Sequence, residues 1–327
     1  MSRVKKRYLL YPILVVILLA SCSASTPISF SDENLETAIK SMLDKESGED
    51  ITTAELAKLT TLQASRMSIE DLSGLEYCTN LTELYLVSNV IEDISPLASL
   101  SNLTILWLQD NQINDISPLA SLTELTELGL YDNNISDISP VASLVNLTGI
   151  GLSDNQINDI SPLASHTQLT MLGLSGNNII DISPLASLTE LTVLDLGEND
   201  ISDFSLITHL TNLTHLELTG CKISDISLLA SLTGLTHLAL PNNEIEDISL
   251  LASFTNLEYL NLDSNQISDI SALLENSGLG LGDYISLEDN NLNLLDRIEG
   301  SEDLNDAREL VRRGVDVYLS SFIELGM

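Results

Sequence analysis

The sequence predicts an α/β solenoid, a curved coil with a parallel β-sheet on its concave side and short 3-10 helices on its outer side. Two observations support this prediction. One pattern of apolar residues returns every 22 residues through the middle of the chain, and such a period is the signature of a solenoid. Within each copy, leucines at alternate positions, such as Leu84 and Leu86, indicate a short strand with one buried face.

The net charge of the chain argues against some classes of binding partner. The 327 residues include 13 Lys and Arg against 48 Asp and Glu, for a formal net charge of −35. Nucleic acid and the anionic face of a membrane would repel such a chain, so we expect neither as a partner. Apolar residues make up 44% of the sequence and are regularly placed, which argues against disorder and favours one elongated unit.

The amino terminus carries an export signal. A basic segment from Arg3 to Arg7 precedes an apolar stretch from Leu9 to Ala20, which is too short to span a bilayer comfortably. The following Leu19-Ala20-Ser21-Cys22 resembles the lipobox of bacterial lipoproteins. The resemblance implies a signal peptide over residues 1–21, cleaved before a lipidated Cys22, and a tether over residues 22–30. It implies an exported lipoprotein of the bacterial cell surface or envelope, with lipid as its membrane contact. An ordinary secretion signal is the alternative.

Residues 31–58 are predicted to form a helical cap. Apolar residues at helical spacing run from Asp32 to Leu43, and Thr52 with Glu55 forms a capping box before a second helix. The segment from Asp44 to Glu55 has some features of an EF-hand loop, but its glycine falls one position early and a ligand is missing. We therefore favour a packing role, with calcium binding as the alternative.

Residues 59–278 contain the repeats. The first clear copy begins at Leu81, a weaker one begins at Leu59, and later copies begin at Leu103, Leu125, Leu147, Leu169, Leu191, Leu213, Leu235 and Leu257. Each copy places seven apolar side chains inward. A single copy cannot bury enough surface to fold alone, so the copies must stack on one another.

Several polar columns recur with the same period. We expect one column of asparagines to bond turn backbone that would otherwise be buried unpaired: Asn89, Asn111, Asn133, Asn155, Asn177, Asn199, Asn243 and Asn265. Cys221 replaces the asparagine once and, like Cys78, is interpreted as a small core residue. Ser-Pro pairs such as Ser95-Pro96 predict 3-10 helices capped by the serine hydroxyl. A column of aspartates, starting at Asp93, precedes these helices. We interpret these side chains as bonding the turn backbone at the helix starts, with a row of calcium sites as the less favoured alternative.

Residues 279–327 are predicted to hold a terminal repeat and a carboxyl-terminal cap. The terminal repeat is displaced by three extra residues and is centred on Leu287-Glu288-Asp289-Asn290. An amphipathic helix from Leu304 to Arg313 ends at Gly314, and a closing strand follows from Val315 to Leu319.

The repeat resembles a known family. Its residues resemble the leucine-rich repeat, and the ending Ile-x-Asp-Ile-Ser-Pro-Leu, seen at Ile91 to Leu97, is similar to the 22-residue subtype of the internalins. The resemblance implies a horseshoe-shaped solenoid that acts in adhesion or protein recognition. Our hypothesis is a binding protein that is not an enzyme and has no cofactor.

The positions that vary between copies predict the binding surface. Inward positions barely change, whereas outward strand positions differ freely, and neighbours in a column lie side by side on a curved sheet. One cluster gathers aromatic, apolar and acidic side chains: Glu83, Tyr85, Ile105, Trp107, Gln109, Asp110, Glu127, Tyr131 and Asp132. Exposed aromatic residues among polar ones are typical of an interaction hot spot. We expect a protein or glycan partner that is basic or bridged by cations. Gly129, Gly151 and Gly173 form a bare strip beside this cluster.

Two other functions remain as alternatives. One is a structural scaffold of the envelope with no discrete ligand. The other is a metal-dependent hydrolase at His215, His237 and Glu217, which fall in adjacent outward columns. The binding function is favoured over both, and no metal or catalytic residue is assigned.

Overall fold

The computed structural model describes residues 26–293 and 302–319. The signal peptide predicted over residues 1–21 and the lipidation site Cys22 lie outside the described residues. Within the described part of the chain, no helix is long and apolar enough to cross a membrane.

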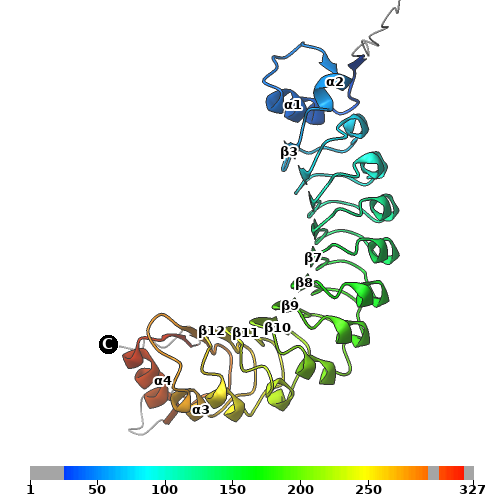
Figure 1. Ribbon diagram of the computed structural model, residues 1–327. Coiled ribbons are helices and arrows are strands. Elements are labelled where there is room, and N and C mark those ends of the chain that lie inside the picture. The colour runs from blue at the N-terminus through cyan, green and yellow to red at the C-terminus, as the bar shows by residue number, and fades with distance from the viewer. Residues whose placement is uncertain (1–25, 294–301, 320–327) are drawn as a thin grey trace, which may run out of the picture.

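The repeats form one parallel sheet on the concave side of a bent solenoid (Figure 1). The sheet has 12 strands in the order β14, β13, β12 and so on to β3, so each repeat pairs with the next. The strands are β3 (Thr61–Gln63), β4 (Glu83–Tyr85), β5 (Ile105–Trp107), β6 (Glu127–Gly129), β7 (Gly149–Gly151), β8 (Met171–Gly173), β9 (Val193–Asp195), β10 (His215–Glu217), β11 (His237–Ala239), β12 (Tyr259–Asn261), β13 (Tyr284–Ser286) and β14 (Asp316–Tyr318). The predicted solenoid and its concave sheet are confirmed.

Short helices line the outer side of the coil, where Figure 1 shows them opposite the strands. Many of them begin with Ser-Pro, and proline is favoured there because it loses no hydrogen bond at the start of a helix. Others begin with Ser-Leu at the same position of the repeat. The 3-10 helices are η1 (Leu75–Tyr77), η2 (Ser95–Ser99), η3 (Ser117–Ser121), η4 (Ser139–Ser143), η5 (Ser161–Ser165), η6 (Ser183–Ser187), η7 (Ser205–His209), η8 (Ile226–Leu229) and η9 (Ser249–Ser253), and the next helix, α3 (Ser271–Glu275), is α-helical.

The core runs along the whole coil between the sheet and the outer helices. Leu84, Leu86, Ile91, Leu97 and their counterparts in later copies are completely or almost completely buried. The pairing register places equivalent residues of successive copies side by side, as with Glu83 and Ile105. Cys78 and Cys221 are both buried free thiols, and burial raises the pKa of Cys78 to about 12.

The amino-terminal cap closes the first coil. β1 (Pro27–Ile28) pairs antiparallel with β2 (Ile51–Thr52), and α1 (Glu33–Met42) and α2 (Thr53–Leu56) complete the cap. Leu35 and Ile39 of α1 are buried against the core.

The carboxyl-terminal cap is a helix followed by a strand. Helix α4 (Glu302–Arg313) buries Leu304, Ala307 and Leu310 and ends at Gly314, which has a φ of 97°. Glycine is favoured in that left-handed region because it has no Cβ. Strand β14 then closes the sheet beside β13.

Candidate functional site on the concave face

An aromatic cluster occupies the amino-terminal part of the concave sheet. The rings of Tyr85 and Trp107 meet edge to face, with centroids 5.0 Å apart and an interplanar angle of 89°. Trp107 is 39% exposed and Tyr131 is 43% exposed. The Tyr85 hydroxyl donates a hydrogen bond of 3.2 Å to Oε2 of Glu83. Desolvation and then this bond raise the pKa of Tyr85. The structure thus brings two aromatic residues of the predicted surface, Tyr85 and Trp107, together.

Acidic side chains border this cluster. Glu127 is half-buried in β6, and Asp110 and Asp132 are exposed in the turns that follow β5 and β6. Both aspartates have a φ near 55°, a conformation that aspartate tolerates better than most residues. Ile105 is half-buried in β5 beside Glu83 and Glu127. The concave surface around the aromatic rings therefore combines apolar contact area with negative charge.

Gln109 differs from its sequence-based placement on the outward surface. Only 9% of the residue is exposed. Its amide folds over Gly129 of the next coil, where a Cβ would overlap the amide nitrogen and carbon. Among the buried side-chain oxygen and nitrogen atoms of the described residues, Oε1 of Gln109 alone has no hydrogen-bond partner. The bare backbone of Gly129 is what allows Gln109 to bury its side chain.

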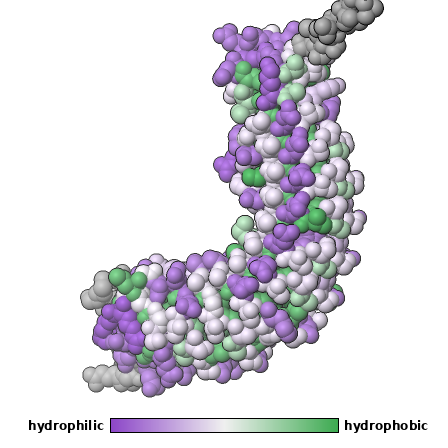
Figure 2. Space-filling model, in the orientation of Figure 1, coloured by the Kyte–Doolittle hydropathy of each residue, from purple (hydrophilic) through white to green (hydrophobic). Residues whose placement is uncertain are grey.

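A shallow hollow of about 270 Å³ continues from this point across strands β5 to β9. Trp107 and Gln109 line one end, Gly151 and Gly173 line the floor, and Asp195 lines the other end. Figure 2 shows a surface on which polar and weakly polar side chains predominate and strongly apolar ones gather in small patches. A glycine-floored hollow therefore adjoins the aromatic cluster.

The concave face carries a second aromatic feature in its carboxyl-terminal half. Five rings follow one another along one column, the first four stacked and the last tilted by 33°, with centroid separations of 4.1, 5.8, 5.0 and 4.9 Å: His215, His237, Tyr259, Tyr284 and Tyr318. In the sequence, the 22-residue spacing connects His215, His237 and Tyr259. The three-residue displacement before Tyr284, and the position of Tyr318 in the cap, hide the last two rings from a search at a period of 22.

The geometry does not assemble the metal site of the hydrolase alternative. The imidazole rings of His215 and His237 are nearly parallel, at 14°, and stack face to face. Each Nδ1 lies 2.9 Å from the hydroxyl of the preceding threonine. Desolvation and then the Asp195 carboxylate raise the pKa of Glu217. The described residues contain no group of three or more His, Cys, Asp or Glu side chains placed to hold a metal ion.

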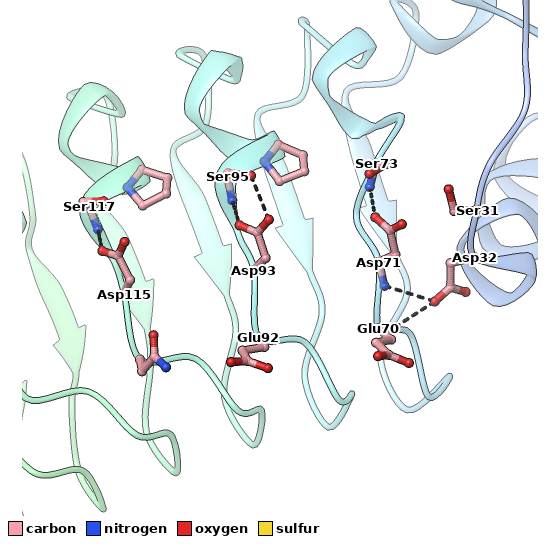
Figure 3. A pocket seen from close by; sticks show the side chains of 13 residues that line it. Ser31, Asp32, Glu70, Asp71, Ser73, Glu92, Asp93, Ser95, Asp115 and Ser117 are labelled. Atoms are coloured by element: carbon pink, nitrogen blue, oxygen red, sulfur yellow. Dashed lines mark hydrogen bonds between the residues drawn. The ribbon is translucent and has the colours of Figure 1, made fainter.

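The aspartate column bonds the backbone at the helix starts (Figure 3). Oδ1 of Asp93 accepts a hydrogen bond of 2.8 Å from the backbone N–H of Ser95, and Asp115 accepts the same bond from Ser117. This bond lowers the pKa of Asp115. The prediction that the serine hydroxyl caps these helices is wrong. The aspartate fills that role, and the hydroxyl of Ser95 itself donates to Oδ2 of Asp93. The adjoining hollow, of about 850 Å³, is lined by several of these acidic residues.

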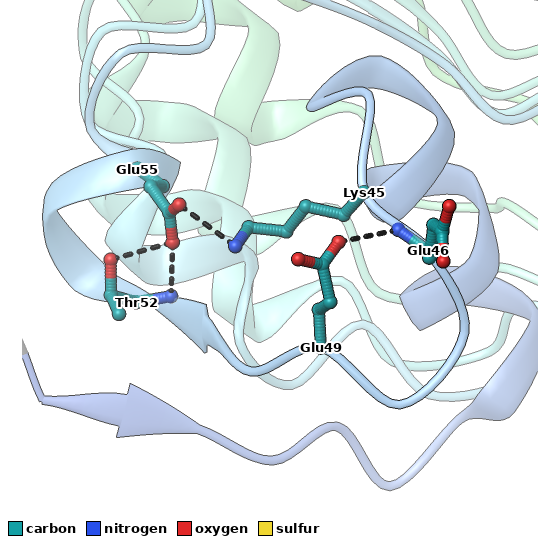
Figure 4. Close-up of polar contacts among 5 residues, drawn as sticks. All are labelled: Lys45, Glu46, Glu49, Thr52 and Glu55. Carbon is teal, nitrogen blue, oxygen red and sulfur yellow. Dashed lines mark hydrogen bonds and ion pairs between the residues drawn. The ribbon is translucent and has the colours of Figure 1, made fainter.

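The loop in the amino-terminal cap is held by a lysine (Figure 4). Nζ of Lys45 lies 2.9 Å from Oε1 of Glu55, and Oε2 of Glu55 accepts bonds from the backbone N–H and the hydroxyl of Thr52. These contacts lower the pKa of Glu55 to about 2, with the Lys45 contact the largest cause. Oε2 of Glu49 accepts a bond of 2.6 Å from the backbone N–H of Glu46. The capping box thus occupies the carboxylate that the EF-hand resemblance would assign to calcium.

The asparagine column ties each coil to the one before it. Nδ2 of Asn133 donates to the carbonyls of Leu108 and Leu130, each at 3.1 Å, and its Oδ1 accepts from the N–H of Ile113 at 3.0 Å. Its counterparts repeat this pattern, and Asn290 extends it into the displaced repeat. At Cys221 the thiol contacts the carbonyls of Leu196 and Thr219 only weakly, at 3.6 and 3.5 Å.

Comparison with known proteins places the repeats in a family. The family model described as leucine-rich repeats (2 copies) matches in overlapping pairs from residue 57 to residue 275. An internalin, InlF, from Listeria monocytogenes str. 4b F2365 is 37% identical, with 92% of this chain and 93% of that chain covered and a TM-score of 0.74. Internalin C2 from the same strain is also 37% identical, over 64% of this chain and 94% of that chain, with a TM-score of 0.62.

A plant protein shares the fold at lower identity. A plant peptide hormone receptor, RGFR1, solved in complex with RGF2, is 20% identical over 78% of this chain and 47% of that chain, with a TM-score of 0.57. At that identity the likeness concerns the fold. The family match and the internalin identities extend over most of the described repeats, so this chain belongs to the leucine-rich repeat proteins and is an internalin-like member of them.

Proposed function

We propose that this chain is a surface lipoprotein that binds a protein partner, without catalysis, through the concave face of its repeats. The observation that carries the proposal is the contact between the rings of Tyr85 and the exposed Trp107. A monomeric protein gains nothing in its own core from an exposed Trp107, whereas exposed aromatic rings with acidic neighbours are typical of interaction hot spots.

The fold supports the same function. A solenoid presents a long concave surface that can vary while its core stays constant. The structurally similar plant receptor RGFR1 is a peptide hormone receptor solved in complex with RGF2. The acidic border of Glu83, Glu127 and Asp132 favours a basic partner or one bridged by cations, which would associate faster at low ionic strength.

Membrane anchorage is part of the proposal and rests on the sequence around Cys22. Lipid on that cysteine would hold the chain at the bacterial surface, since each buried CH2 of an acyl chain contributes about 0.8 kcal/mol. We expect Cys22→Ala to move the protein from the membrane fraction to the soluble fraction. Mass spectrometry of the mature amino terminus would contradict anchorage by finding Cys22 without acyl chains.

Capture from surface extracts tests the binding function. The full chain, with Tyr85→Ala and Trp107→Ala combined, should lose at least thirtyfold in affinity for its captured partner, as expected for a hot spot. Tyr77→Ala is the matched control, because Tyr77 is 40% exposed but belongs to η1 on the outer side. Equal loss in both variants, or no loss in either, would contradict the concave site.

A further inference from the structure

The hollow beside Trp107 has the features of a built binding site. Its floor is backbone, because Gly151 and Gly173 have no side chains to fill it. A Cβ at residue 151 would meet no atom within 4 Å, so the space above the floor is open. At the end of this floor lies the unpartnered Oε1 of Gln109, in a residue that is more than nine-tenths buried. A buried acceptor without a donor is costly, so such an atom points to a missing partner.

The hollow spans a distance that a short extended chain can cover. Pairing register places Trp107, Gly129, Gly151, Gly173 and Asp195 side by side on five successive strands. At about 4.8 Å between strands, Trp107 and Asp195 are about 19 Å apart along the sheet. An extended peptide advances about 3.3 Å per residue, so a segment of about six residues spans this distance.

The polar groups at the two ends of the hollow indicate the orientation and charge of a bound peptide. At the Trp107 end, the Gln109 amide lies over Gly129, and its Oε1 is an acceptor without a donor. At the other end, Asp195 accepts bonds from the Ser175 hydroxyl and the Gly197 N–H, and the pKa of Glu217 is raised by burial and then by the Asp195 charge. A cation would relieve the repulsion between those two carboxylates.

We propose that the hollow binds an extended segment of a protein partner that carries a lysine or arginine at the Asp195 end. The peptide backbone lies over Gly151 and Gly173, one backbone N–H donates to Oε1 of Gln109, and an apolar side chain packs against Trp107. The inference rests on the proposed function and narrows it to a basic peptide class. A glycan is disfavoured, because the floor offers a sugar few hydrogen-bonding groups.

Trp107 is the single tryptophan of the chain, so its fluorescence reports directly on this hollow. The probes are acetylated and amidated hexapeptides, Val-Ser-Val-Ser-Val-Lys and the same peptide ending in Glu, with maltohexaose as a neutral glycan. We expect the Lys peptide to shift the emission of the full chain saturably to shorter wavelength, and the Glu peptide to bind at least tenfold more weakly. No saturable shift with the Lys peptide, equal binding of both peptides, or a shift with maltohexaose alone would overturn the proposal.

Two variants test the geometry. Gly151→Val fills the hollow from its floor and should abolish the shift without loss of folding, because its Cβ enters open space. Gly151→Ala, which fills less of the space, should weaken binding less. Gln109→Leu should weaken binding of the Lys peptide about fivefold while raising the melting temperature of the protein. If Gln109 had a purely structural role, the peptide affinity and the melting temperature would change in the same direction. Unchanged binding by Gly151→Val would also overturn the proposal.

The outcome separates this inference from the proposed function. If capture of a protein partner depends on Trp107 but the Lys peptide does not bind, the inference fails and the proposed function stands. If the Lys peptide binds but capture does not depend on Tyr85 and Trp107, the proposed function fails instead.

Discussion

The imidazole ring of His215 stacks on that of His237, with centroids 4.1 Å apart. Desolvation and then the neighbouring His237 lower the pKa of His215, while Glu258 opposes the shift. A lowered pKa means that the folded state binds fewer protons than the unfolded state as the pH falls below about 6.5. The folded state is therefore stabilised by a neutral His215 ring, and this contribution is lost in acid.

The first prediction is a pH dependence of stability. Between pH 7.5 and 5.5 the melting temperature of the native chain should fall more steeply than that of His215→Phe, which keeps a stacked ring but cannot be protonated. His209→Phe is the matched control, because His209 is exposed on the outer side of the coil. Parallel melting curves for the native chain and His215→Phe would contradict the coupling.

The second prediction concerns the asparagine column. Asn133→Cys should destabilise the fold by about 2–4 kcal/mol, because it leaves buried backbone groups without partners. Cys221→Asn should act in the opposite direction, by about 1 kcal/mol, because it restores the amide that the other coils have. Urea denaturation of the two variants checks the signs, and a loss of stability in Cys221→Asn would refute the argument.

The third prediction concerns Asp32, which joins the amino-terminal cap to the first coil. Its carboxylate accepts backbone bonds from Asn34 and Leu35 of α1 and from Glu70 and Asp71 of the coil. Burial alone would raise its pKa, but these bonds outweigh burial and lower it. Asp32→Ala should cost about 1–2 kcal/mol near neutral pH.

This contribution should also depend on pH in a defined direction. Because the folded-state pKa of Asp32 is lowered, its stabilising effect is present above about pH 3.8 and is lost as the pH falls through the lower folded-state value. The stabilities of the native chain and Asp32→Ala should converge in acid. A difference that stayed constant from pH 7 to pH 2.5 would contradict this role.

The fourth prediction concerns the buried amide of Gln109. Gln109→Leu replaces an unpartnered acceptor with a slightly shorter apolar side chain, so it should stabilise the free protein by about 1 kcal/mol. Gln109→Ala, which leaves the space above Gly129 unfilled, should not. Thermal unfolding of both variants decides whether the polar group or its volume controls stability.

The sequence predicts the structure within each repeat well. It does not predict side-chain positions that depend on contacts between successive coils. The 22-residue period predicted the strands, the core columns and the exposure of Trp107, because each depends on position within a copy. Gln109 was misplaced because its burial depends on the absence of a Cβ at Gly129 in the next copy.

Two further differences have the same physical origin. Which of two neighbouring polar groups caps a helix depends on side-chain geometry, so the sequence favoured Ser95 where the structure uses Asp93. The 22-residue period does not reveal Tyr284 as the neighbour of Tyr259, because three extra residues separate them, although the two pair in the sheet. Residues on adjacent strands therefore remain neighbours in the sheet even where the 22-residue spacing between them is lost.

The asparagine bonds join each coil only to its immediate neighbour. The molecule can therefore change length by whole units during evolution: a duplication or deletion of 22 codons would extend or shorten the inner wall by about 4.8 Å and leave both caps unaltered. The length of the surface that faces a ligand can therefore change in a single mutational event, without any change in the core.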